Sequence, residues 1–156
     1  MLKEILSPES CAACRLCCTF DESDLWEIPV FSAALGERVA RERPELPLLP
    51  YGVKSRVLKT PLGADGLARC PALSERGCTL GENKPFDCMI WPFRVMEREG
   101  RRLLTISSLC APSQKIDREK LAAFAEKLLP TVRKEIEENP DVIKPYRGDY
   151  RIVAAL

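Results

Sequence analysis

The sequence predicts a small α+β fold in which helices pack on a short antiparallel sheet. Three observations support this prediction. The chain has 156 residues, enough for one hydrophobic core but not for two, so residues 1–156 are expected to form a single domain. Two segments carry apolar side chains at helical spacing, and one pair of β-type segments is separated by a tight turn. Runs of strand and helix that do not alternate regularly are typical of α+β proteins.

The first elements after the N-terminal region are predicted to be helical. Asp21 or Ser23 can cap a helix that continues to about Glu27, and Pro29 interrupts it because proline cannot continue a helical hydrogen-bond ladder. A second helix is predicted over 31–41, where three apolar side chains recur every four residues and therefore lie on one face. That face is expected to belong to the core.

The middle of the chain is predicted to be extended. Three prolines in residues 44–50 lack backbone donors, which favours an extended connector. Short strands are predicted over 56–60 and 67–69. The clearest β signal is a hairpin of residues 93–98 and 102–107, in which a Glu-Gly pair supplies the tight turn.

The C-terminal helical region is predicted over 117–139. Asp117 is a typical N-cap, and apolar side chains follow it at helical spacing. Pro130 is expected to kink or restart this helix, and Pro140 to end it. Residues 150–156 are predicted to form a strand or a docked tail.

Composition and charge exclude several classes of protein. Lys and Arg number 24 against 23 for Asp and Glu, so no net basic field favours nucleic acid. No apolar run approaches the 18 residues that a membrane-spanning helix needs, and the N-terminal residues do not resemble a secretory signal. We therefore expect a cytoplasmic monomer that binds neither nucleic acid nor membrane, while a protein partner stays open.

The eight cysteines are the strongest functional signal. In a reducing compartment, clustered thiols indicate metal binding or redox chemistry more often than disulfides or inert core thiols. The chain contains no histidine, which removes Ser-His and Cys-His catalysis and every mixed Cys/His zinc site. All eight cysteines are candidate metal ligands, and they fall into two groups: Cys11, Cys14, Cys17 and Cys18; then Cys70, Cys78, Cys88 and Cys110.

The spacing of the first group indicates the kind of metal. Cys11-x2-Cys14-x2-Cys17 repeats the ligand spacing of bacterial ferredoxins, whose fourth cysteine precedes a proline, as Cys70 does here. We expect an iron-sulfur cluster in preference to zinc. Zinc stays open because both metals accept all-sulfur tetrahedral ligation. The spacing leaves open whether the ligands form one site or two.

These motifs also resemble a known family. The chain carries them in this order: Cys11-x2-Cys14-x2-Cys17-Cys18, Cys70-Pro-Ala-Leu, Cys78, Lys84-Pro85-x2-Cys88 and Trp91-Pro92. The set covers about residues 11–110 and resembles the YkgJ-type cysteine-cluster family of CxxCxxCC zinc- or iron-chelating domains. The resemblance implies chelation by all eight cysteines. The chain departs from the family pattern at Leu80, where an aromatic is usual, at Lys84, where arginine is usual, and at Trp91, where phenylalanine is usual.

Three functions are compatible with the sequence. The first is a metal-binding protein with a role in electron transfer, in metal handling or as an accessory protein, whose ligation ties helices and sheet together. The second is an enzyme of methyl transfer or redox chemistry, because some relatives in the resembling family are described as flagellin lysine methylases. The third is a zinc-stabilised interaction module. The sequence lacks a glycine-rich nucleotide or S-adenosylmethionine loop, and it assigns no catalytic residue.

Overall fold

The largest sheet is formed by residues from the second half of the chain. The computed structural model describes residue 6 and residues 13–156. The strand order is β10-β8-β9-β11, with β10 parallel to β8 and the other neighbours antiparallel. The strands are β8 (Phe93–Arg98), β9 (Arg101–Ser107), β10 (Lys144–Pro145) and β11 (Tyr150–Ala155). The predicted hairpin and the predicted C-terminal strand are therefore confirmed.

The turn of the β8–β9 hairpin follows from its sequence. Arg98 and Arg101 are directly paired, so only Glu99 and Gly100 lie in the loop. Both loop residues have positive φ values, 53° and 74°. A two-residue turn of this kind needs positive φ at both positions, which glycine adopts without a steric penalty.

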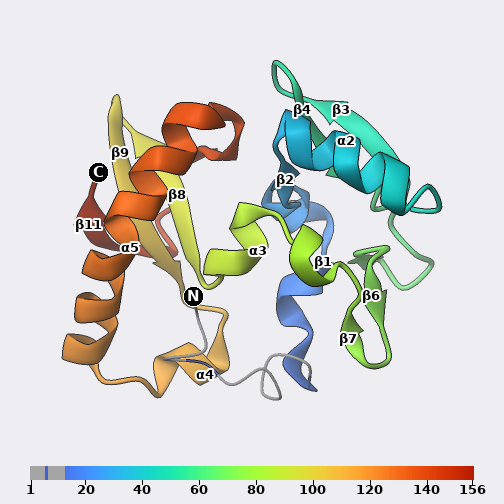
Figure 1. The fold of residues 1–156 in the computed structure, drawn as a ribbon. Coiled ribbons are helices and arrows are strands. Elements are labelled where there is room, and N and C mark those ends of the chain that lie inside the picture. The colour runs from blue at the N-terminus through green and yellow to red at the C-terminus, as the bar shows by residue number, and fades with distance from the viewer. Residues whose placement is uncertain (1–5, 7–12) are drawn as a thin grey trace.

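Helix α5 (Arg118–Glu138) packs on this sheet (Figure 1). The Asp117 side chain accepts hydrogen bonds from the backbone N–H groups of Glu119 and Lys120, which confirms the predicted cap. The helix includes Pro130 and is one element on both sides of it. Its buried face joins the apolar side chains of β8 and β9 in the main core, which includes Val95, Leu104, Leu121, Phe124, Leu128 and Val132.

A second, smaller layer lies beside the main sheet. Its three strands have the order β2-β4-β3, and α2 packs against them (Figure 1). Ser32 caps α2, so the helix begins two residues later than predicted. The predicted connector contributes an edge strand, a position in a sheet where proline is tolerated. The elements are β2 (Val30–Phe31), α2 (Ala33–Glu42), β3 (Leu48–Tyr51) and β4 (Ser55–Leu58).

Short elements connect the two layers. Strand β1 pairs with β5, and β6 with β7, each in a two-stranded antiparallel sheet. In Figure 1, α3 lies between the main sheet and the smaller layer. These elements are η2 (Leu16–Cys18), β1 (Thr19–Phe20), η3 (Glu22–Glu27), β5 (Ala68–Arg69), β6 (Leu73–Ser74), β7 (Gly77–Cys78), η4 (Gly81–Asn83), α3 (Phe86–Ile90), α4 (Ala111–Gln114) and η5 (Pro140–Val142).

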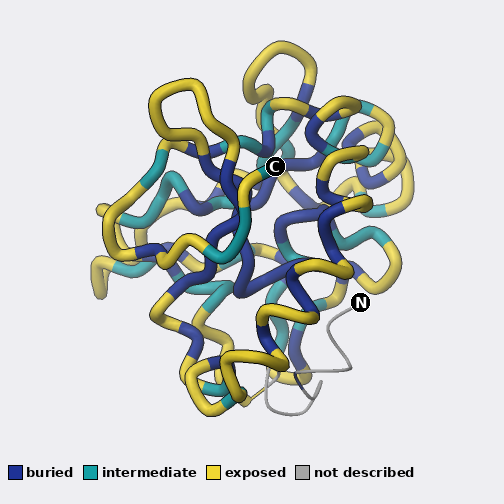
Figure 2. The backbone as a smooth tube through the Cα atoms, turned by 90° about the vertical axis from the view of Figure 1, so that its left-hand side faces the viewer, coloured by how far each residue is buried: buried dark blue, intermediate teal, exposed yellow. Residues whose placement is uncertain are grey.

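Within residue 6 and residues 13–156, buried apolar side chains form three clusters. Figure 2 shows buried backbone inside the molecule and exposed loops around it. The main cluster belongs to the β8–β9 sheet, and the second lies under α2. The third contains Leu6, Trp91 and Cys110, with Cys17 packed against it. Within the described residues, no helix is long and apolar enough to cross a membrane.

Candidate metal centre

The two cysteine groups meet through the pairing of β1 with β5. Thr19 is paired with Arg69, and the N–H of Cys70 donates to the carbonyl oxygen of Cys18 at 2.9 Å. This hydrogen bond extends the ladder by one residue and places the end of the first group beside the start of the second. The structure thus brings together residues that the sequence separates by a long segment.

Cys17 and Cys18 form the tightest pair of thiols. They lie in the 3-10 helix η2, which follows Arg15 in a left-handed conformation (φ 55°). Their Sγ atoms are 4.0 Å apart. Two thiolates at about 2.3 Å from a tetrahedral zinc ion are separated by about 3.8 Å, so this spacing suits two ligands of one ion.

The two thiols of this pair differ in their readiness to ionise. The hydrogen bond from Cys18 lowers the pKa of Cys17 to about 7, although burial opposes the shift and Arg94 assists it. The same hydrogen bond first, and then burial, raise the pKa of Cys18. Of the two thiols, Cys17 therefore has the lowered pKa and Cys18 the raised one.

Two cysteines of the second group, Cys70 and Cys88, lie within electrostatic reach of this pair, and Cys78 lies within reach of Cys70. The charges of Cys17, Cys70 and Cys88 all raise the pKa of Cys18. Burial and then the charges of Cys78 and Cys17 raise the pKa of Cys70. Burial raises the pKa of Cys88 well above its ordinary value, and Cys17 and Cys70 add to this effect. We call these five residues the thiol cluster: Cys17, Cys18, Cys70, Cys78 and Cys88.

The remaining predicted ligands are placed differently. Cys110 is buried with Trp91 in the third apolar cluster, against which Cys17 also packs. Cys14 is exposed. Cys11 lies outside the described residues.

The donor chemistry and the geometry of the site can be compared with what a metal needs. All seven described cysteines are free thiols, and thiolates are the ligands that zinc and iron-sulfur clusters accept. Among the described residues, no three Cys, Asp or Glu side chains are already arranged around a common metal position. The residue types therefore fit a thiophilic metal, and the Cys17–Cys18 pair supplies two suitably spaced sulfurs.

A buried ionic network adjoins the thiol cluster. Arg94 Nε donates to Glu27 Oε2 at 3.1 Å, and its Nη1 donates to the backbone oxygen of Asp87 at 2.9 Å. The Tyr150 hydroxyl donates to the other oxygen of Glu27, and Val30 N–H donates to Asp87 Oδ2. The sequence does not reveal this network, because its charged residues are distant in the chain and none belongs to a recognisable motif.

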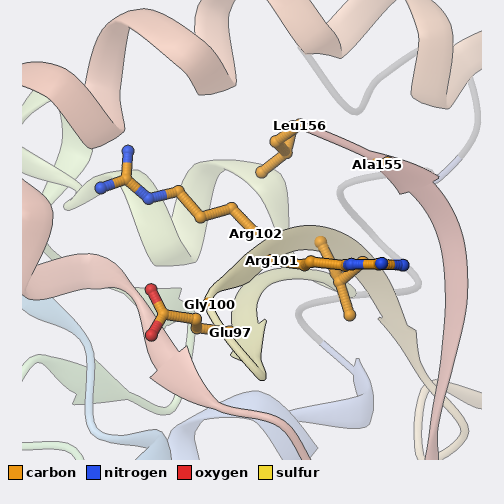
Figure 3. A pocket seen from close by; sticks show the side chains of 7 residues that line it. Glu97, Gly100, Arg101, Arg102, Ala155 and Leu156 are labelled. Atoms are coloured by element: carbon orange, nitrogen blue, oxygen red, sulfur yellow. The ribbon is translucent and has the colours of Figure 1, made fainter.

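Two pockets are relevant to which part of the molecule is the candidate functional site. A cavity of about 40 Å³ is lined by Cys17 together with Glu27, Trp91 and Leu109, among others. A larger open pocket of about 530 Å³ lies at the hairpin tip, where the Arg101 and Arg102 side chains leave the strand in opposite directions (Figure 3). The larger pocket contains no thiol and no buried charged residue, so the thiol cluster is the better candidate site.

Comparisons with known proteins leave the family open. No protein-family model, no curated protein and no solved structure matches the chain. The resemblance to the YkgJ-type family thus stays a prediction from the cysteine motifs alone.

Proposed function

We propose that this chain is a metal-binding protein whose cysteines hold an iron-sulfur cluster or zinc. One observation carries the proposal. Free thiols from both cysteine groups lie near one another, with the Cys70 backbone N–H donating to the Cys18 carbonyl oxygen, in a protein that has no histidine to serve as an alternative ligand. Two of them are 4.0 Å apart. The resemblance to the cysteine-cluster family supports the same function.

The electrostatics of the thiol cluster explain why a metal would be favoured there. Ionised Cys17, Cys70 and Cys88 repel one another, as their mutual effects on pKa indicate. Partial burial makes this repulsion more costly because little water screens it. A bound cation offsets the negative charge of the thiolates and stabilises their ionised form. The arrangement is thus costly for several free thiolates and favourable for a metal-thiolate site.

The ligands would come from both cysteine groups. Cys17 and Cys18 supply a pair at suitable spacing, and Cys70, Cys78 and Cys88 are further candidate ligands. Cys110 adjoins Cys17 through the third apolar cluster. Iron-sulfur ligation would suit electron transfer, whereas zinc would suit a structural or metal-handling role.

The test is a metal and sulfide analysis of untagged protein purified without oxygen. An untagged chain is essential because an oligohistidine tag would add ligands that the natural sequence lacks. An iron-sulfur protein should be brown and contain acid-labile sulfide, while a zinc protein is colourless because zinc has a filled d shell. Folded protein with less than about 0.2 equivalents of either metal would contradict the proposal, since tight structural sites fill stoichiometrically.

A further inference from the structure

Arg94 is almost completely buried, which is unusual for a charged residue. Its side chain is 2% exposed, and its two carboxylate partners are 5% (Glu27) and 2% (Asp87) exposed. Burial alone would lower the pKa of Arg94, but Asp87 and Glu27 outweigh burial and raise it. The guanidinium therefore remains a buried positive charge at every physiological pH.

The contacts of Arg94 fix this charge beside the thiol cluster. Its Nη1 donates to the carbonyl oxygen of Asp87, the residue directly before Cys88. Its guanidinium lies 4.7 Å from the ring centroid of Trp91, in the apolar cluster that Cys17 contacts. Glu27, which accepts from Arg94, lines the same small cavity as Cys17. Several independent contacts thus hold one cation in the neighbourhood of Cys17 and Cys88.

Each of the two carboxylates also has a donor besides Arg94. Asp87 Oδ2 accepts from Val30 N–H at 3.0 Å, and Glu27 accepts from the Tyr150 hydroxyl. Both carboxylates are thus held in place by donors besides Arg94, and they in turn fix the position of its guanidinium. The charge of Arg94 lowers the pKa of Cys17 and of Cys88, which agrees with the placement that these contacts give, whereas burial and the charge of Asp87 raise the pKa of Cys88.

We propose that Arg94 is the buried counter-charge of the cysteine site and that it raises the affinity of that site for its metal. This inference rests on the proposed metal-binding function. A zinc ion with four thiolates carries a net charge of −2, so a fixed cation nearby stabilises the loaded site. Arg94 is a positioning residue for charge and is not itself a ligand.

The experiment measures Zn²⁺ affinity of the full chain by competition with a chelator. Arg94→Gln removes the charge and should weaken Zn²⁺ binding about 10- to 100-fold, the usual effect of losing an outer-shell partner. Arg94→Lys retains the charge and should restore most of the lost affinity. Arg98→Gln is the matched control because Arg98 lies on the same strand but is exposed, and it should leave the affinity unchanged.

Glu27→Gln separates an electrostatic role from a structural one. It breaks the same ion pair as Arg94→Gln but removes a negative charge instead of a positive one. We expect Glu27→Gln to bind Zn²⁺ at least as tightly as the wild-type chain, even where it lowers stability. A purely structural role predicts weaker binding in both variants. If Arg94→Gln does not fold, the Zn²⁺ affinity of Glu27→Gln tests the inference by itself. Weaker Zn²⁺ binding by Glu27→Gln than by the wild-type chain overturns the inference.

The outcomes also distinguish this inference from the proposed function. A wild-type chain that binds no Zn²⁺ would overturn both. A wild-type chain that binds Zn²⁺ tightly, with a folded Arg94→Gln variant of equal affinity, would overturn only the role of Arg94. The ultraviolet charge-transfer band of Cd²⁺ bound to thiolates, measured in each variant, should keep its amplitude at saturating Cd²⁺, because Arg94 is not a ligand.

Discussion

Cys70 donates its backbone N–H to the carbonyl oxygen of Cys18 at 2.9 Å. This hydrogen bond joins two cysteine groups that are separated by residues 19–69 in the chain. A metal with ligands from both groups would close that long loop. Loop closure removes entropy from the unfolded chain, so a shared site would stabilise the whole fold.

The first prediction concerns this shared site. Cys18→Ser and Cys88→Ser lie in different groups, and we expect each to reduce metal content and to destabilise the whole protein. Cys14→Ser is the comparison because Cys14 is exposed, and its effect should be smaller. Metal analysis and hydrogen exchange on the three variants measure both effects. If Cys18→Ser leaves the metal content and exchange protection around Cys78 and Cys88 unchanged, the groups form two separate sites.

The second prediction concerns the thermodynamic effect of metal on folding. Free Zn²⁺ at 100 times its dissociation constant should raise the free energy of unfolding of the metal-free chain by about 2.7 kcal/mol, provided that the unfolded chain binds it weakly. Cys18→Ser should show a smaller increase at the same Zn²⁺ concentration. Urea unfolding with buffered Zn²⁺ measures the difference. Equal increases in the two proteins would exclude Cys18 as a ligand.

The third prediction tests the connection between the smaller layer and η5. Gly52 has a φ of 58°, and a Cβ at this position would overlap the Asp141 carboxylate, which accepts from Ser55 Oγ at 2.6 Å. Gly52→Ala should therefore lose stability through both backbone strain and displacement of Asp141, by about 2–4 kcal/mol. Gly66→Ala is the matched control, since Gly66 has a φ of 75° but open space around it, and should cost only about 1–2 kcal/mol. Equal losses in urea unfolding would contradict the proposed overlap.

The elements that the sequence predicted well are those with strong local signals. Asp117 caps α5 as expected, and Glu99 with Gly100 forms the expected turn. The edge strand at Leu48–Tyr51 was wrongly predicted to be a connector, because its prolines suppress the strand signal and only pairing with β4 stabilises it. The short helix α3, which begins at Phe86, was not predicted. That short helix depends on tertiary packing.

The sequence predicts which residue type forms the candidate site, but not how those residues are arranged in space. Cysteine spacing alone could not distinguish an extended loop from a helix around Cys17 and Cys18, and the structure has a short 3-10 helix there. The approach of Cys70 to Cys18 depends on the long-range pairing of β1 with β5, which cysteine spacing does not encode. Arg94 and Glu27 carry no motif, so their pairing could be found only in three dimensions.

The last prediction concerns Tyr150, which donates its hydroxyl proton to Glu27. Burial first, and then the charge of Glu27 and this hydrogen bond, raise the pKa of Tyr150 above its ordinary value of about 10. The folded protein holds this proton more tightly than the unfolded chain. The stabilisation is therefore complete below about pH 10 and is lost as the pH rises above it.

Tyr150→Phe should lower the free energy of unfolding by about 1.5–3 kcal/mol at pH 8, because it removes a hydrogen bond to a charged group and keeps the ring that packs on Trp26. The difference between wild type and variant should shrink between pH 10 and 11, since only the wild-type chain can lose this proton. Urea unfolding of both proteins from pH 8 to 11 measures this difference. The titration of lysine side chains affects both proteins equally and therefore drops out of the difference. Tyr146→Phe serves as control, because the Tyr146 hydroxyl donates to a backbone oxygen instead of a carboxylate. A wild-type to Tyr150→Phe difference that stays constant up to pH 11 would refute the buried hydrogen bond to Glu27.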